Sequence, residues 1–224
     1  MSISSPYFNA LILGYTGATG QALLTELVKS DKVNQIVCLG RTAPPYDHHK
    51  VQFVQANMSQ LINHLEVFAG VSRVYCCLGT TMAKAGSKAA FRAVDYDMVV
   101  NAALLAAQAG VLHFSVVSAI GAHAKSFFFY NRVKGEMEDA LQKIGFQRLS
   151  IYRPGLILAD RTEHRPGEKM AAAVFPLLEK LFPSRYRSIQ AGTIAKAMLL
   201  NSIKTDEGVE VLQNGDMEVL AQSL

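Results

Sequence analysis

The sequence lacks several features that mark whole classes of protein. Its 224 residues include no tryptophan, and the basic residues behind its net charge of +4 are scattered, with no run of five. That distribution argues against nucleic acid as a main partner. No apolar segment approaches about 18 uninterrupted residues, and no basic stretch leads into an apolar one at the N-terminus. We therefore expect no membrane partner and no signal peptide.

Cysteine is scarce too, and the chain has no pattern typical of a metal site. Cys38, Cys76 and Cys77 are the three cysteines, and each lies in an apolar, strand-like run. They are predicted to be buried free thiols in a reducing environment, which favours a cytoplasmic protein. The histidines have no metal-ligand spacing with cysteine or carboxylate residues, so no metal is expected.

What the sequence does contain is a regular alternation of strand-like and helix-like segments. The predicted strands are Tyr7–Leu13, Gln35–Leu39, Val51–Gln55, Arg73–Leu78, His113–Ser118 and Leu149–Arg153, and the predicted helices run from Gly20 to Lys29, near Leu61–Phe68, and over Phe91–Ala109 and Tyr130–Ile144. This order favours an α/β fold, a Rossmann-type doubly wound parallel sheet, in a single domain of residues 1–224. Residues 155–224 are expected to contribute a small helical cap over the strand ends, with helices near Lys169–Leu181 and Ala191–Ile203.

Three glycines follow the first predicted strand at regular spacing. Gly14, Gly17 and Gly20 stand between an apolar strand and a helix whose leucines fall on one face. In dinucleotide-binding proteins the first such glycine permits a tight turn, the second lets the backbone approach the pyrophosphate, and the third lets helix and strand pack closely. The phosphates then lie at the positive end of the helix. This context predicts nucleotide binding, and a purely structural strand–turn–helix is the alternative.

An arginine after the second predicted strand indicates which nucleotide binds. Arg41 lies about 20 residues beyond the glycine turn, where NAD enzymes carry an acidic residue for the ribose 2′-hydroxyl. A carboxylate there would repel a 2′-phosphate, whereas a guanidinium can bind one through two hydrogen bonds. The position therefore predicts NADP(H) as the cofactor, with an ordinary surface arginine as the alternative.

Three side chains form a candidate catalytic set. Tyr130 and Lys134 are four residues apart in a predicted helix and share a face, and a nearby ammonium lowers the pKa of a phenol. Ser118 ends a predicted strand, where its hydroxyl can hold a carbonyl oxygen, and no Gly-x-Ser-x-Gly surrounds it to suggest a hydrolase nucleophile. The Tyr-x-x-x-Lys spacing alone would fit a surface pair. In this order, and after a glycine turn, it predicts an oxidoreductase.

Several longer motifs accompany this set, namely Cys76-Cys-Leu-Gly-Thr-Thr81, Lys84-Ala-Gly86, Val94-Asp95-Tyr96, Arg153-Pro-Gly155 and Arg165-Pro-Gly-Glu168. With them the chain resembles the short-chain dehydrogenase/reductase superfamily, in its atypical branch, and within it the Tat-interacting-protein-like oxidoreductases. The resemblance implies an NADP-binding Rossmann fold with Ser118, Tyr130 and Lys134 as catalytic residues. It implies cofactor contacts from Gly14, Thr16, Gly17, Ala18, Thr19, Gly20, Arg41, Asn57, Leu78, Gly79, Thr80, Tyr130, Lys134, Arg153, Pro154 and Gly155.

Two positions depart from the superfamily pattern. Asp95 stands where many extended members carry an asparagine, which puts a proton relay through that helix in doubt. Asn57-Met58 replaces a pair containing aspartate that often touches the adenine, so the adenine contact expected from Asn57 is weaker.

Two functions are compatible with these residues. The first is an NADPH-dependent reductase of a small-molecule carbonyl substrate, in which Tyr130 donates the proton, Lys134 lowers its pKa and Ser118 holds the oxygen. The alternative is an NADPH-binding regulatory or redox-sensing protein that acts through a protein partner without turnover. The chain is expected to be a monomer or a homodimer. Phe127–Phe129 is predicted to be an apolar wall of the substrate site, with plain core as the alternative.

Overall fold

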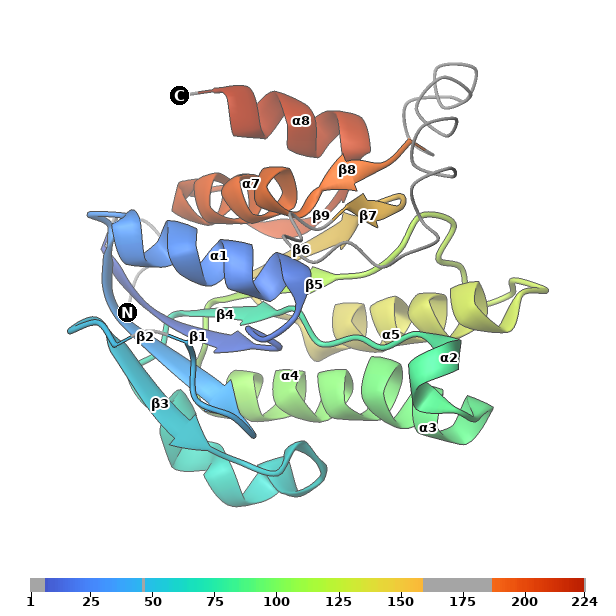
Figure 1. Ribbon diagram of the computed structural model, residues 1–224, viewed down its shortest axis with the longest axis horizontal. Coiled ribbons are helices and arrows are strands. Elements are labelled where there is room, and N and C mark those ends of the chain that lie inside the picture. The colour runs from blue at the N-terminus through green and yellow to red at the C-terminus, as the bar shows by residue number, and fades with distance from the viewer. Residues whose placement is uncertain (1–6, 46, 159–186, 224) are drawn as a thin grey trace.

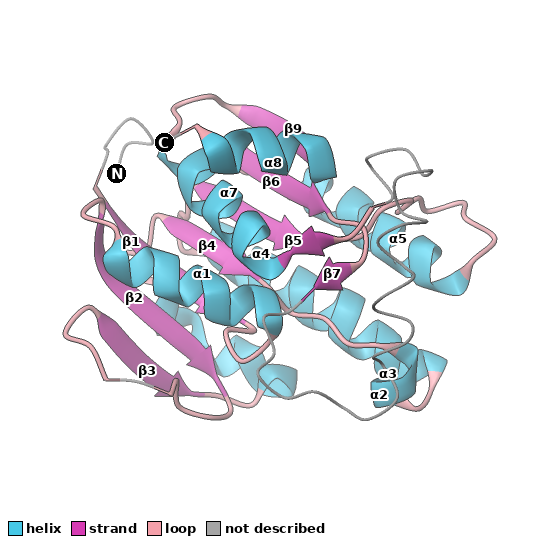
Figure 2. Cartoon of the chain, turned by 45° about the horizontal axis from the view of Figure 1, so that its top comes forward, coloured by secondary structure: helices cyan, strands magenta, loops and turns pink. Residues whose placement is uncertain are grey.

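A parallel β-sheet forms the centre of the protein. The computed structural model describes residues 7–45, 47–158 and 187–223. The strands of the main sheet are β1 (Phe8–Leu13), β2 (Val33–Gly40), β3 (Val51–Gln55), β4 (Arg73–Cys76), β5 (His113–Val117), β6 (Arg148–Arg153) and β9 (Gly208–Gln213), in the order β3-β2-β1-β4-β5-β6-β9. Every neighbouring pair is parallel, and Figure 2 shows the twist of the sheet. The predicted Rossmann-type doubly wound sheet is confirmed.

Helices cover both faces of this sheet. Helices α1 (Ala18–Lys29) and α7 (Ala191–Ile203) pack on one face, and α4 (Met98–Gln108) and α5 (Phe129–Ile144) lie on the other (Figure 1). Successive residues of a strand point to opposite faces, so in β1 Leu11 belongs to one apolar core and Ile12 to the other. Strands covered on both sides read as continuous apolar runs, which is why the sequence predicted them well. No helix in the described ranges is both long and apolar enough to cross a membrane.

The predicted helix Phe91–Ala109 is present in a modified form. Helix α3 (Lys88–Arg92) leads through η2 (Ala93–Asp97), a π-helical turn, directly into α4. The remaining short helices, α2 (Met82–Ala85) and the 3₁₀ helix η1 (Met58–Phe68), follow β4 and β3. The π-helical turn has a place in the candidate site described below.

The described part of the C-terminal segment joins the main sheet and one of its helical layers. Helix α7 has the bounds predicted for it, but it packs beside α1 in the helical layer, and α8 (Asn214–Gln222) packs on α7. Strand β9 lies beside β6 and extends the main sheet, covering backbone groups that β6 would otherwise leave unpaired at an edge. The short strands β7 (Ile157–Leu158) and β8 (Ile189–Gln190) form a separate parallel pair. The predicted helix near Lys169–Leu181 lies outside the described residues.

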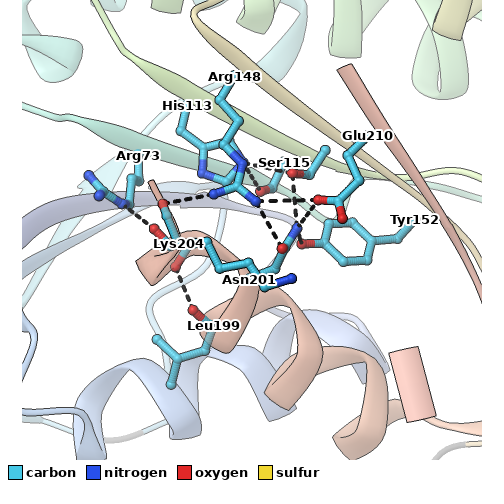
Figure 3. A network of polar contacts seen from close by, with 11 residues as sticks. Arg73, His113, Ser115, Arg148, Tyr152, Leu199, Asn201, Lys204 and Glu210 are labelled. Carbon is cyan, nitrogen blue, oxygen red and sulfur yellow. Dashed lines mark hydrogen bonds and ion pairs between the residues drawn. The ribbon is translucent and has the colours of Figure 1, made fainter. Parts of the chain in front are cut away.

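A buried polar network ties α7 to the amino ends of the central strands (Figure 3). Arg73 Nε donates to Ser202 O at 2.7 Å, and Arg148 Nη1 donates to Lys204 O at 2.8 Å. Both acceptors are carbonyls at the C-terminal end of α7, where a helix leaves such groups without partners and favours positive charge. His113 begins β5, as predicted, and its Nε2 lies 2.9 Å from Ser150 Oγ.

This network predicts a loss of stability in acid. Burial, and secondly the neighbouring charges of Arg148 and Arg73, hold the pKa of His113 well below its usual 6.5. The folded state therefore binds fewer protons than the unfolded chain, so stability is complete above about pH 6.5 and falls as the pH drops below it. We expect a loss of up to about 1.4 kcal/mol per pH unit from this group until the folded pKa is reached.

Urea unfolding at pH 7.5, 6.5, 5.5 and 4.5 would measure this loss in the wild type and in His113→Gln. The variant should show a flatter pH dependence, while His64→Gln, which changes a partly exposed histidine, should follow the wild type. Parallel losses in the wild type and in His113→Gln would contradict the prediction.

Candidate functional site

The glycine turn after β1 is tightly built. Gly14 has a positive φ of 75°, and a Cβ added to it would lie 2.5 Å from the carbonyl oxygen of Cys77. A Cβ on Gly20 would lie 2.2 Å from Gly14 O, so the start of α1 packs directly on the turn. The first and third glycines are therefore required by the fold itself.

The second glycine is different. Gly17 has an ordinary extended conformation, with φ at −82°, and a Cβ added to it would meet only Gly14 O, at 3.4 Å. Gly17 is also the N-cap of α1 and offers no side-chain cap to the first-turn amides, which belong to residues such as Ala18 and Thr19. An open backbone with uncapped N–H groups at a helix N-terminus fits a pyrophosphate. Packing within the described residues does not require a glycine at position 17, and its contact with a cofactor stays a prediction.

A buried tyrosine places the Arg41 loop beside this turn. Tyr15 OH donates to Thr42 O at 2.5 Å, and a Cβ on Gly40 would lie 2.8 Å from the same hydroxyl. Burial raises the pKa of Tyr15 to about 12, so the phenol stays a donor. The Arg41 side chain itself is exposed at the carboxyl end of β2.

The other predicted cofactor residues lie at the carboxyl ends of neighbouring strands. Asn57 follows β3 and caps η1, accepting from Ser59 N at 3.2 Å and from the Ser59 hydroxyl at 2.9 Å. Leu78, Gly79 and Thr80 follow β4, next to β1 in the sheet. Ligands of open α/β sheets bind outside these strand ends, so the structure brings the predicted residues to one edge.

The two predicted catalytic residues of α5 have different surroundings. Tyr130 is 37% exposed and its ring centroid lies 5.4 Å from that of Phe91, whereas Lys134 is buried. Lys134 Nζ lies 2.8 Å from Asp95 Oδ1 and donates to Val117 O at 3.3 Å. Burial raises the pKa of Tyr130; the Lys134 charge lowers it and the Asp95 charge raises it. The sequence predicted that Lys134 lowers the pKa of Tyr130, but burial and Asp95 outweigh this effect and the pKa is raised.

The hydroxyl of Ser118 is held by a buried carboxylate. Ser118 follows β5 and donates to Glu138 Oε1, and Glu138 also accepts from Arg153 Nε at 3.0 Å and forms an ion pair with the Arg153 guanidinium. Glu138 is 1% exposed. An ionised carboxylate only accepts hydrogen bonds, so the single O–H of Ser118 is directed at Glu138.

The Arg153-Pro154-Gly155 motif joins the ends of several segments. Ile120 N donates to Pro154 O at 2.9 Å, and Gly155 N donates to Asn214 Oδ1 at 2.9 Å. A Cβ on Gly155 would lie 2.3 Å from Arg187 O. The motif therefore has an evident structural role at the end of β6, and its contact with a cofactor stays a prediction.

The three phenylalanines before Tyr130 are divided. Phe127 is 92% and Phe128 70% exposed, so the alternative of plain core does not apply to them. Phe129 is partly buried, with its ring centroid 5.8 Å from that of Phe91.

Sequence reasoning did not assign the partners of the catalytic set. Glu138 was available from spacing, since Tyr130, Lys134 and Glu138 stand at i, i+4 and i+8 of one helix. Asp95 was noted only as a departure from the superfamily pattern. Its contact with Lys134 joins two helices that the chain separates by 39 positions, and no local spacing reveals such a pair.

A parallel doubly wound sheet with an open glycine turn at its carboxyl edge defines a nucleotide-binding Rossmann-fold protein. Comparison with family models bears this out, because residues 14–169 match the NAD(P)H-binding family. The chain belongs to that family.

Known relatives cover nearly the whole chain. Protein HTATIP2 of Rattus norvegicus is 36% identical over 210 residues, which are 92% of this chain and 86% of that protein. The mitochondrial protein fmp52 of Emericella nidulans is 30% identical over 215 residues, 93% of this chain and 90% of its own. The resemblance to the Tat-interacting-protein-like group is therefore confirmed.

The expected cytoplasmic location is corrected by the same relatives, since fmp52 of Emericella nidulans and FMP52 of Candida albicans are named mitochondrial. Free thiols report a reducing environment and not one particular compartment, so they could not support that expectation.

Solved structures with the same fold include NAD complexes. MoeE5 in complex with UDP-glucose and NAD has a TM-score of 0.69 and 13% sequence identity, covering 95% of this chain and 80% of its own. WbmG of Bordetella bronchiseptica in complex with NAD has a TM-score of 0.68 and 15% identity, covering 92% and 73%. At this identity the likeness establishes the fold alone.

Proposed function

We propose that this protein is an NADP(H)-dependent oxidoreductase that reduces a small carbonyl substrate. The observation that carries the proposal is that Tyr130 and Lys134 lie on one helix face at the carboxyl edge of the sheet, the same edge that holds the open turn at Gly17. A partly exposed phenol beside a buried ammonium, near a nucleotide site, is equipped for proton transfer. The family match supports the nucleotide, and the choice of NADP(H) rests on Arg41.

Each residue of the candidate site has a separate role in the proposed reaction. The backbone at Gly17, Ala18 and Thr19 would hold the pyrophosphate and Arg41 the 2′-phosphate. When bound, the nicotinamide supplies the hydride that reduces the carbonyl carbon. Tyr130 donates its proton to the carbonyl oxygen, and the Lys134 ammonium stabilises the phenolate that remains.

Ser118 has a narrower role than the sequence suggests. Its O–H is directed at Glu138, so toward a substrate it presents lone pairs. Ser118 must turn away from Glu138 before it can donate to a carbonyl oxygen. Tyr130 is therefore the proton donor in this proposal, and Ser118 can hold the carbonyl oxygen only after its hydroxyl has turned.

The test is to offer the protein a panel of aldehydes and ketones as substrates and to monitor NADPH oxidation by absorbance. Turnover that requires Tyr130 would support the proposal. Tight NADPH binding without turnover on any carbonyl would instead favour the regulatory or redox-sensing role. In that role the exposed side chains of Phe127 and Phe128, just before α5, would suit contact with a protein partner.

Cofactor choice gives a separate prediction. We expect NADPH to bind at least about tenfold more tightly than NADH, a difference of about 1.4 kcal/mol. Arg41→Ala should remove most of that preference because it removes the partner of the 2′-phosphate. Lys143→Ala, which removes an exposed positive charge at the far end of α5, should leave the preference unchanged. Calorimetric titration would decide, and equal affinities in the wild type would refute the NADP(H) assignment.

A further inference from the structure

Asp95 is a buried carboxylate that touches the candidate site from outside α5. Only 1% of its surface is exposed, and both of its oxygens have partners. Oδ1 lies 2.8 Å from Lys134 Nζ, and Oδ2 accepts from the backbone N–H of Thr80 at 2.9 Å. One side chain therefore links the lysine of α5 to the loop that follows β4, where the cofactor is expected.

The local structure around Asp95 is unusual. Asp95 lies in η2, a π-helical turn between two α-helices. Such turns are rare, usually occur singly inside α-helices, and are frequent at functional sites. Burying a charge is costly unless it is paired and hydrogen-bonded, and here the carboxylate is both.

Burial is the main cause of the raised pKa of Tyr130, and two charges of opposite sign also act on it. Among the described residues, the charged groups that act on its hydroxyl are Lys134, from its own helix, and Asp95, from η2. Phe91 of α3 supplies an apolar neighbour. A carboxylate in contact with an ammonium cancels much of the field that the ammonium would exert on the phenol.

We propose that Asp95 is a positioning residue, which holds the Lys134 ammonium beside Thr80 and opposes its charge at the Tyr130 phenol. In the proposed function, on which this role rests, a protonated Tyr130 is the form needed to reduce a carbonyl. With the ammonium unbalanced, the phenolate would be more populated, and the site would suit removal of a proton from an alcohol.

The test is a pH titration of Tyr130 in the full chain, monitored by NMR with tyrosine labelled with ¹³C at Cζ. The Tyr130 signal is identified as the one that is missing from the spectrum of Tyr130→Phe. In Asp95→Asn, which keeps a hydrogen-bonding side chain but loses the charge, the pKa of Tyr130 should fall by about 1–3 units relative to the wild type. Asp97→Asn makes the same change at an exposed position two residues away and should leave the titration unchanged. An unchanged Tyr130 titration in folded Asp95→Asn would overturn the proposal.

A double variant keeps the test decisive if Asp95→Asn fails to fold. Asp95→Asn combined with Lys134→Met removes both buried charges together and leaves neither unpaired. Because the two charges oppose each other, the pKa of Tyr130 should rise less in this double variant than in Lys134→Met alone, where the Asp95 charge is unopposed. A rise as large as that in Lys134→Met would show that the Asp95 charge does not act on the phenol, and would overturn the proposal.

These titrations need neither cofactor nor substrate. The proposed role of Asp95 can therefore be supported even if the protein reduces no carbonyl, and it can be refuted even if the protein does. If turnover is found, the Asp95→Asn variant should also lose reductase activity at a lower pH than the wild type, because its donor loses its proton earlier.

Discussion

Replacing Tyr130 with phenylalanine is expected to slow NADPH-dependent carbonyl reduction by about 10²–10⁴-fold, the usual contribution of general acid–base catalysis. The substitution removes the proton donor and keeps the ring, which packs near Phe91. The affinity for NADPH should barely change, because the backbone of the glycine turn and Arg41 provide the main phosphate contacts in the proposal. Initial rates on the best carbonyl of the panel, together with a fluorescence titration of NADPH, would measure both quantities.

Tyr7→Phe is the matched control for that experiment. It removes a hydroxyl of the same kind from an exposed tyrosine before β1, at the opposite edge of the sheet, and should leave the rate unchanged. A Tyr130→Phe enzyme that reduces its substrate at the wild-type rate would refute the assigned mechanism. Lys134→Met should damage both rate and cofactor affinity, since it removes the charge beside the phenol and the expected ribose contact.

Gly17→Val is expected to abolish binding of NADPH and NADH while leaving the fold intact. The added Cβ meets only Gly14 O, at 3.4 Å, and φ at Gly17 is −82°, so the backbone accepts a side chain. That side chain would occupy the approach of the pyrophosphate. We expect the affinity to fall by more than about 100-fold, or about 2.7 kcal/mol. Calorimetry would measure binding and thermal unfolding would confirm the fold.

Two other glycines make this experiment specific. Gly20→Val should destabilise the protein outright, because its Cβ would lie 2.2 Å from Gly14 O. Gly192→Val adds the same side chain at the first turn of α7, where nothing lies within 4 Å of the Cβ, and should bind cofactor normally. Unchanged binding in Gly17→Val would mean that the turn is only structural.

Local sequence patterns were sufficient for most of the fold. Continuous apolar runs predicted the buried strands, and β3 and α7 have the bounds expected from sequence. Strand β9 was missed because Val209 and Val211 are exposed at the edge of the sheet and give no apolar run. Pairing with β6 decides its place, and that contact joins segments about 60 residues apart along the chain.

Some features of the candidate site were likewise predictable from local sequence, and others depend on contacts between distant segments. The glycine spacing, Arg41 and the i, i+4 pair of Tyr130 and Lys134 are local features, and each indicates its chemistry without knowledge of the fold. The direction of the Ser118 hydroxyl was not predictable, because Glu138 and Arg153 come to it from α5 and β6. Tyr15 likewise reaches Thr42 across a loop closure of 27 residues.

The sequence by itself determined the class of fold and indicated the candidate nucleotide site and the candidate catalytic side chains, because these follow from periodicity and short spacings within single elements. Only the tertiary structure decided their electrostatic state. Asp95, 39 positions before Lys134, lies against its ammonium, and burial changes the strength of every charge nearby. Whether a phenol keeps its proton depends on such contacts between elements, and these arise only when the helices pack together.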